Sequence, residues 1–120
     1  MKPYSCLTAA LAFALTLAQA PGADAAEGSA QSATLVRVQM SRDNILFIRL
    51  AEPPSVRAGC ATDGFWHFTL DLDDAFAKNM YAQILVAYAQ GQRVHIGGTG
   101  FCNEFATAES IKGFALDTGA

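Results

Sequence analysis

The sequence predicts a small, mainly β domain with a single helix, and three observations predict it. Apolar residues alternate with a period of two in several short segments. The period changes to that of a helix over one stretch only, residues 74–90. Two cysteines remain once the N-terminal segment is set aside, which is typical of a small exported domain with one disulfide.

The N-terminal segment, residues 1–25, has the pattern of a secretory signal peptide. A positively charged start at Lys2 precedes an unbroken run of apolar and small residues, Leu7–Leu17, and Ala23 and Ala25 supply the small residues that signal peptidase reads. A membrane anchor would need about 20 apolar residues, and this run is about half as long. We therefore expect cleavage after Ala25, a periplasmic or secreted protein, and no membrane attachment afterwards.

The remaining chain divides into a leader and one domain. Residues 26–33 are small and polar, which predicts a flexible leader, and residues 34–117 are predicted to form the single folded unit. The net charge is −3 and no basic patch is present. Nucleic acids and anionic membranes are therefore not expected as partners.

Cys60 and Cys102 are the cysteines that follow the signal segment, since Cys6 would leave with it. In a small exported domain such a pair indicates a disulfide. A shared metal or two free thiols are the alternatives. A metal would need further ligands, and the chain offers only two histidines, His67 and His95.

The first two strands are expected to form a hairpin. Thr34–Ser41 alternates, with Val36, Val38 and Met40 on one face and polar residues on the other. Asp43-Asn44 supplies turn residues that tolerate a positive φ. Ile45–Leu50 is apolar enough to be largely covered, and Pro53-Pro54 ends it because proline cannot donate to a sheet ladder.

A loop over Ser55–Gly64 then leads to a third strand, Phe65–Leu70. Its alternation places Trp66, Phe68 and Leu70 on one face and Phe65, His67 and Thr69 on the other.

The helix is expected to span Asp74–Gln90. Asp71 or Asp73 can cap its start, and Gly91 is placed for a left-handed stop. Its apolar half comprises Phe76, Ala77, Met80, Tyr81, Ile84, Leu85, Ala87 and Tyr88.

The C-terminal part of the chain completes the sheet. Arg93–Gly97 is predicted as the fourth strand, Gly97–Gly100 as a bulge or turn, and Ser110–Leu116 as the fifth strand. Cys102 lies in the irregular stretch between them, Phe101–Ala108.

The predicted order is strand, strand, strand, helix, strand, strand. This is the order of an OB-fold, a five-stranded Greek-key barrel with a helix between its third and fourth strands. A plain α+β sandwich with the helix on one sheet face is the alternative.

One segment carries a resemblance. Asp74–Ile96 resembles the helix, glycine and strand of the binding (B) subunits of pertussis-like A-B toxins. Together with the Gly-Thr-Gly-x-Cys segment at Gly98–Cys102, it is also similar to a group of small exported proteobacterial proteins of unknown function. The toxin resemblance implies an OB-fold, ring pentamers and glycan binding. It carries over no sugar-binding residue, because the matching segment contains none.

The residues that could carry catalysis or a metal are few. His67 and His95 could serve acid–base chemistry or a metal if an aspartate lay close, but their strand positions favour solvated side chains. Asp71, Asp73 and Asp74 could hold calcium, but their spacing does not fit an EF-hand loop and favours helix capping.

No catalytic motif is visible elsewhere. Gly97–Gly100 lacks the lysine and the following helix of a phosphate loop, and no Gly-x-Ser-x-Gly is present. We therefore expect no enzyme activity, no catalytic residue, no metal and no cofactor.

Exposed aromatic residues are the stronger indication of function. Phe65, Phe101 and Phe105 are the candidate ligand-contact residues, and Phe47 also lies opposite the predicted core face. Such rings either complete the core or stack on a sugar or a subunit. A strip of small residues on the helix is a candidate oligomer contact, with an ordinary alanine-rich surface as the alternative: Lys78, Ala82, Val86 and Ala89.

The sequence therefore predicts an exported, non-catalytic binding module. It would be oligomeric, as a ring, and would bind a glycan or a protein in the manner of a toxin B subunit. The alternative is a monomeric periplasmic accessory or structural protein with the same fold.

Overall fold

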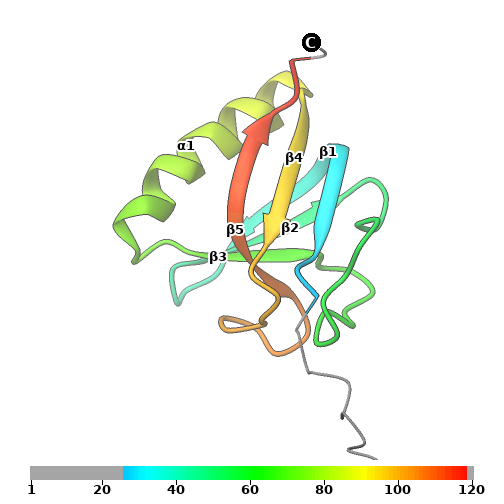
Figure 1. Ribbon diagram of the computed structural model, residues 1–120. Helices are drawn as coiled ribbons and strands as arrows, with labels where there is room; N and C mark the ends of the chain where they lie inside the picture. Colours follow the sequence, from blue (N-terminus) through cyan, green and yellow to red (C-terminus); the bar gives the residue numbers. More distant parts are fainter. Residues whose placement is uncertain (1–25, 119–120) are drawn as a thin grey trace, which may run out of the picture.

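The computed structural model describes residues 26–118 and contains five strands and one helix (Figure 1). The predicted signal peptide, residues 1–25, lies outside the described residues. The order of elements is the predicted one: β1 Ser29–Met40, β2 Ile45–Leu50, β3 Phe68–Asp71, α1 Ala75–Gln90, β4 Arg93–Gly98 and β5 Glu109–Leu116.

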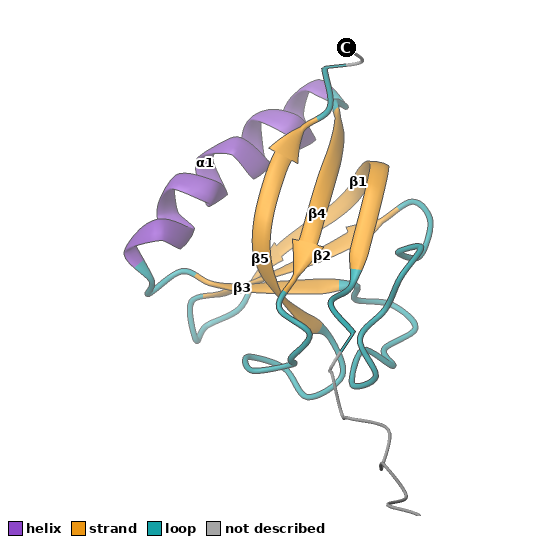
Figure 2. Cartoon of the chain, viewed as in Figure 1, coloured by secondary structure: helices purple, strands orange, loops and turns teal. Residues whose placement is uncertain are grey.

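The strands form a closed barrel in the order β1-β2-β3-β5-β4, and β4 pairs with β1 to close it. The β3–β5 pairing is parallel and the other four are antiparallel. The helix α1 packs against β5 and β1, and it runs beside β5 in Figure 2. Closure leaves β1 paired on both sides, so a small domain hides its longest sheet edge.

The barrel interior is filled by the inward-facing residues of the strands and by one side of α1. β2 is largely covered, as predicted: every second residue from Leu46 to Leu50 is fully buried, and the residues between them are half-buried. The core comprises Ala30, Leu35, Leu46, Ile48, Leu50, Phe68, Leu70, Leu72, Ala77, Ile84, Ala87, Val94, Ile96 and Ile111.

The N-terminal leader prediction needs correction. β1 begins at Ser29, so most of residues 26–33 belong to the sheet. Ser29 and Ala30 pair with Gly97 and Ile96 of β4, and Ala30 is part of the core. Small residues look like a linker in the sequence, but here they let β1 pass close to β4.

The predicted inward face of β1 is also wrong in part. The register shifts between Leu35 and Arg37, which marks a β-bulge. Leu35 is buried before the bulge and Val38 is half-buried after it, whereas Val36 and Met40 are exposed. A bulge inserts one residue and so breaks a strict period of two.

The turn between β1 and β2 matches the prediction, because Asn44 takes the left-handed conformation with φ 60°. In contrast, β3 begins at Phe68, three residues later than predicted. Phe65 and Trp66 therefore belong to the preceding loop, and Trp66 does not join Phe68 and Leu70 in the core.

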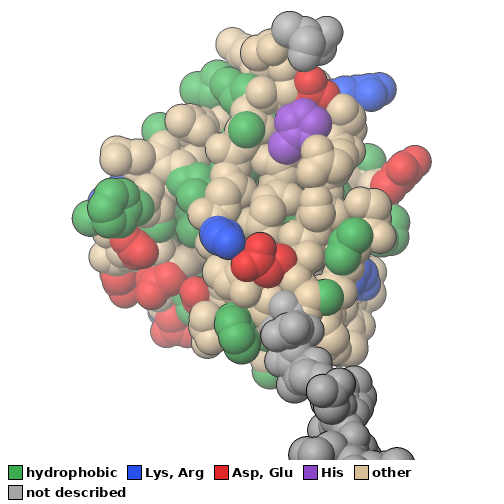
Figure 3. Space-filling model, viewed as in Figure 1, with side chains coloured by type: hydrophobic (Ala, Val, Ile, Leu, Met, Phe, Trp, Pro, Cys, Tyr) green, Lys and Arg blue, Asp and Glu red, His purple; other side chains and the backbone are tan. Residues whose placement is uncertain are grey.

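The helix ends at Gln90 as predicted, and Gly91 follows it with φ 63°. Its start is capped by Asp74, whose carboxylate accepts from the Phe76 N–H, and not by Asp71 or Asp73. Only part of the predicted apolar half is covered: Phe76 is 82% exposed, and Leu85 and Tyr88 are also exposed. Hydrophobic side chains are visible over the helix in Figure 3.

β5 matches its predicted range with one residue added, Glu109. The pairing of β4 with β5 shifts register between Gly97 and Gly98. As a result, Ile111 faces the core on one side of the shift, and Phe114 and Leu116 pack against the core on the other side. Within residues 26–118, no helix combines the length and hydropathy that a membrane span requires.

Candidate functional site

Two long loops meet at the same end of the barrel (Figure 2): the β2–β3 loop, residues 51–67, and the β4–β5 loop, residues 99–108. The predicted disulfide joins them. Cys60 and Cys102 are bonded, with 6.1 Å between their Cα atoms. Segments that are far apart in the sequence are thereby held as one surface.

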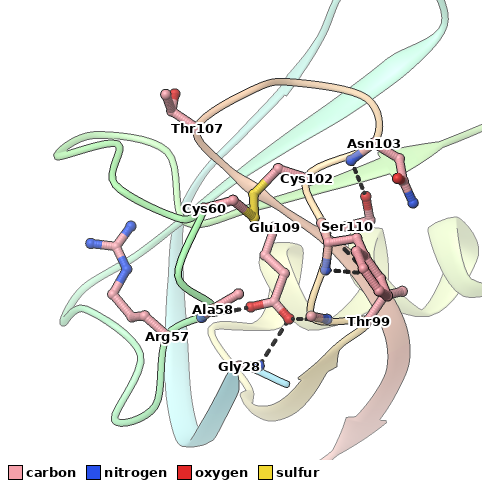
Figure 4. Close-up of a disulfide and its surroundings, with 12 residues drawn as sticks. Gly28, Arg57, Ala58, Cys60, Thr99, Cys102, Asn103, Thr107, Glu109 and Ser110 are labelled. Atoms are coloured by element: carbon pink, nitrogen blue, oxygen red, sulfur yellow. Dashed lines mark hydrogen bonds between the residues drawn. A yellow bond between two sulfur atoms is a disulfide. The ribbon is translucent and has the colours of Figure 1, made fainter. Parts of the chain in front are cut away.

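A buried carboxylate supports the same junction. Glu109 is 1% exposed, and its Oε2 accepts from the backbone N–H groups of Gly28 and Gly100, both at 2.9 Å. Its Oε1 accepts from the Ala58 N–H at 3.3 Å. Figure 4 shows this carboxylate beside the disulfide, between the N-terminal segment and the two loops. Donors from three segments satisfy the charge, so Glu109 organises the loops and leaves no lone charge to act on a ligand.

Asp63 shapes the tip of the β2–β3 loop. Its Oδ1 accepts from the backbone N–H groups of Phe65 and Trp66, both at 2.7 Å, and its Oδ2 accepts from the Thr107 hydroxyl at 3.2 Å. The two backbone bonds, to Trp66 first and then to Phe65, lower the pKa of Asp63. The ionised carboxylate therefore sets the direction in which two aromatic side chains leave the loop.

Four aromatic rings pack together outside the barrel. Phe65 and Trp66 meet edge to face with centroids 4.8 Å apart, and Trp66 lies 5.4 Å from Phe47 of β2. Phe47 meets Phe105 of the β4–β5 loop edge to face at 5.2 Å. The rings come from β2 and from both loops joined by the disulfide.

Two arginines complete this surface. The Arg49 guanidinium carbon lies 4.1 Å from the Phe65 ring centroid. The Arg37 guanidinium carbon lies 5.7 Å from the Phe65 centroid and 6.0 Å from the Trp66 ring. These are cation–π distances. We call the whole set the aromatic–arginine cluster: Arg37, Phe47, Arg49, Phe65, Trp66 and Phe105.

His67 lies beneath the cluster and is buried, so the prediction of a solvated side chain is wrong. Its Nδ1 accepts from the Leu50 N–H at 3.0 Å, which continues the β2–β3 contact beyond the strands. Burial first, and then the nearby guanidiniums of Arg57 and Arg49, lower the pKa of His67. A neutral ring used as a backbone acceptor plays a structural part.

His95 lies in a different environment and does not meet His67. Its Nδ1 accepts from the Ser32 N–H at 3.2 Å, and its Nε2 lies 3.6 Å from the Asp117 carboxylate. The Ser32 hydroxyl donates to Asp117 and not to the histidine, so no activated nucleophile is formed.

A hollow of about 330 Å³ lies near this histidine, between β1 and the start of the β2–β3 loop. Its lining is mostly small residues, such as Ala30, Ala33 and Ala51, with one cation, Arg93. No aromatic ring lines it. The aromatic–arginine cluster offers aromatic rings and guanidiniums, which give more specific chemistry for a ligand than this lining does.

Acidic side chains gather beside the start of α1 (Figure 3). Asp71 accepts from the Asp73 N–H, Asp73 accepts from the Asn44 amide, and Asp74 caps the helix. Among residues 26–118, no group of three or more His, Cys, Asp and Glu side chains is placed to hold a metal ion.

The three predicted ligand-contact aromatics fall into two groups. Phe65 and Phe105, each 38% exposed, are members of the cluster. Phe101 is 58% exposed and makes no ring contact with the cluster residues. On α1, the whole candidate oligomer strip is exposed: Lys78, Ala82, Val86 and Ala89.

Sequence reasoning missed several residues that build this surface. Trp66 was assigned to the core, and Arg37, Arg49, Asp63 and Glu109 were not singled out. An Asp-Gly-aromatic-aromatic run at residues 63–66 is a turn signal that could have moved the start of β3. The pairing of Arg37 with Arg49 across the two strands depends on the bulge in β1, which no local pattern marks.

Comparison with known proteins adds no family: no protein-family model matches the sequence, and no curated protein matches it significantly.

Proposed function

We propose that this protein is an exported, non-catalytic binding module whose ligand lies on the aromatic–arginine cluster. The observation that carries the proposal is the exposed surface of packed rings, with Phe65 and Phe105 each 38% exposed and two guanidiniums over Phe65. Aromatic faces stack on sugars and seal protein contacts, and they are costly to leave exposed without a partner.

The barrel topology supports the same proposal. The order β1-β2-β3-β5-β4, with a parallel β3–β5 pair and a helix between β3 and β4, agrees with an OB-fold. OB-folds bind along the face of strands 2 and 3 and the neighbouring loops. Phe47, Phe65 and Phe105 lie on β2 and on the two loops at that location.

Export supports the proposal from another direction. A cleaved signal over residues 1–25 would place the domain in the periplasm or outside the cell, where its disulfide is stable. A glycan or a protein is then the ligand class to test first, in line with the resemblance to toxin B subunits.

The test is a glycan array probed with the protein purified with its disulfide intact. We expect a defined set of glycans to be bound, and Phe65→Ala to abolish binding. Phe101→Ala is the matched control, since this exposed phenylalanine lies outside the cluster. Binding that survives Phe65→Ala would refute the site, and binding of no glycan would leave the protein-binding accessory role as the better account.

Self-association is a second part of the proposal, favoured by one observation: α1 exposes Phe76, Leu85, Val86 and Tyr88. A ring would cover this surface and present several clusters at once, raising avidity. The native mass tests it. Val86→Glu should convert an oligomer to monomers while Gln83→Glu does not, and a monomeric unmodified protein would remove the ring.

A further inference from the structure

We infer that the ligand of the aromatic–arginine cluster is acidic: Arg37 and Arg49 together bind an oxyanion carried by a saccharide. This inference rests on the proposed function and specifies its ligand class. It begins from the register of β1 and β2, in which Arg37 and Arg49 are direct cross-strand partners. Like charges placed directly opposite one another destabilise a sheet.

Neither arginine is neutralised within the described part of the chain. The ion pairs there are Lys112 with Glu27 and His95 with Asp117, on other surfaces. Two acidic residues of the loops that carry the cluster, Asp63 and Glu104, are engaged with other partners. Asp63 accepts from two backbone N–H groups and the Thr107 hydroxyl, and Glu104 accepts from the hydroxyls of Thr69 and Ser110.

A third guanidinium, that of Arg57, lies near His67, as Arg49 does. Arg57 donates to the backbone oxygen of Asp63 at 2.8 Å, and its Nε is buried with no hydrogen-bond partner. Arg57 and Arg49 both lie near enough to His67 to lower its pKa, so the neighbouring histidine stays neutral. The cluster therefore concentrates cations in a protein whose net charge is −3.

The rings determine what kind of anion fits. The guanidinium carbons of Arg49 and Arg37 lie over the Phe65 ring, 4.1 Å and 5.7 Å from its centroid. A guanidinium that packs over an aromatic ring can still donate two parallel hydrogen bonds to a carboxylate or a sulfate of the ligand. The exposed aromatic edges of Phe65 and Phe105 can then contact the sugar ring to which that group is attached. A free inorganic anion would use the arginines but gain nothing from the rings.

The negative net charge of the protein favours an acidic saccharide over a nucleic acid as the ligand. A nucleic acid would require a basic groove that follows several phosphates, whereas this surface offers one arginine pair and an acidic remainder. A saccharide bearing one or a few carboxylates or sulfates matches a single pair of guanidiniums. We therefore assign the site to an acidic oligosaccharide.

The test measures affinity for five probes: a heparin hexasaccharide, an oligogalacturonate, a neutral maltohexaose, inorganic phosphate and a single-stranded DNA oligonucleotide. We expect one or both acidic oligosaccharides to bind more tightly than the neutral one, and phosphate to bind weakly. Arg37→Gln should weaken acidic binding about tenfold. Arg42→Gln is the matched control, since Arg42 is exposed on the same hairpin outside the cluster and its loss should leave affinity unchanged.

Two further readouts separate binding from support of the fold. Removing Arg37 relieves the like-charge pair, so Arg37→Gln should unfold at the same temperature as the unmodified protein or higher. Arg49→Lys keeps the positive charge but loses the planar guanidinium that can donate two parallel hydrogen bonds. It should weaken binding of the acidic oligosaccharides and leave binding of maltohexaose unchanged.

The outcomes distinguish this inference from the proposed function. If saccharides bind and Phe65→Ala abolishes binding, but acidic and neutral probes are bound alike, the function stands and the inference is overturned. If single-stranded DNA binds more tightly than either acidic oligosaccharide, the ligand class is wrong. If none of these probes binds, the inference is overturned, and the proposed function then depends on a protein ligand. A lower unfolding temperature for Arg37→Gln with unchanged affinity would show that the arginine only supports the fold.

Discussion

At the scale of single residues, the organisation of the site depends on one buried carboxylate. Glu109 joins three segments through backbone N–H groups, and none of its partners is a cation. Such a centre is invisible in the sequence, because Glu109 and its donors Gly28, Ala58 and Gly100 are spread over the chain. Only the closed barrel brings them together.

Two adjacent glycines test this centre. A Cβ atom built on Gly98 would lie 1.7 Å from Oε2 of Glu109, whereas one on Gly97 meets no atom within 4 Å. Gly98→Ala should therefore lower the free energy of unfolding by about 1 to 3 kcal/mol. Gly97→Ala should change it by about 0.5 kcal/mol or less. Urea unfolding of both variants measures the difference, and equal midpoints would contradict the packing described.

His67 gives the protein a pH dependence of known sign. Its pKa is lowered from 6.5 by burial and by Arg57 and Arg49, so the unfolded chain binds its proton first. Stability is therefore unaffected above about pH 6.5 and falls as the pH drops below it, until the folded-state pKa is reached. The slope is at most about 1.4 kcal/mol per pH unit.

The matched variant is His67→Asn, because its amide oxygen can accept from the Leu50 N–H without titrating. Unfolding free energies measured between pH 7 and 5 should fall for the unmodified protein. The free energy of unfolding of the His67→Asn variant should fall by less over the same pH range. If the unfolding free energies of the two proteins change with pH in parallel, the pKa of His67 is the same in the folded protein as in the unfolded chain.

At the scale of elements, the sequence patterns predicted which segments form strands and helix better than which residues they bury. The helix and β2 follow unbroken periods, and their predicted ranges agree with the structure. β1 contains a bulge and β3 is preceded by the Asp63 turn. Both features change which side chains face outward, since the bulge exposes Val36 and the turn moves Phe65 and Trp66 out of β3. The bulge also sets the register that pairs Arg37 with Arg49.

The helix start provides a test at this scale. Asp74 caps α1 by accepting from the Phe76 N–H at 2.9 Å, whereas Asp73 accepts from the exposed Asn44 side chain. Asp74→Ala should lower the free energy of unfolding by about 1 kcal/mol. Asp73→Ala should lower the free energy of unfolding by less, because a hydrogen bond between exposed side chains contributes little to stability. Thermal unfolding compares them, and a larger loss for Asp73→Ala would reverse the assignment of the cap.

At the scale of the whole molecule, the barrel organises the strands and the disulfide joins the two long loops. The order of the elements and the Cys60–Cys102 bond were both predictable, the first from the hydrophobic periods along the chain and the second from the number of cysteines. The aromatic–arginine cluster was predictable only in part, through Phe65 and Phe105. Its arginines and Trp66 depend on the bulge and on the meeting of two loops.

Removing the disulfide measures how much it contributes to the free energy of unfolding of the domain. The bridged cysteines are 42 residues apart, so the chain-entropy account gives a loss of about 4 kcal/mol for a Cys60→Ser, Cys102→Ser variant. Glu109 retains its donors in that variant, and we expect the barrel to persist with a lower urea midpoint. An unchanged midpoint would show that the unfolded chain is already compact around this loop.

The ligand is expected on the aromatic–arginine cluster, and the only tryptophan of the chain is a member of this cluster. Emission from Trp66 therefore reports on this surface alone. We would titrate the disulfide-intact protein with heparin hexasaccharide or oligogalacturonate and follow that emission. We expect a saturable change that follows the binding curve from calorimetry and is lost in Phe65→Ala. Calorimetric binding with unchanged Trp66 emission, retained in Phe65→Ala, would place the ligand elsewhere on the protein.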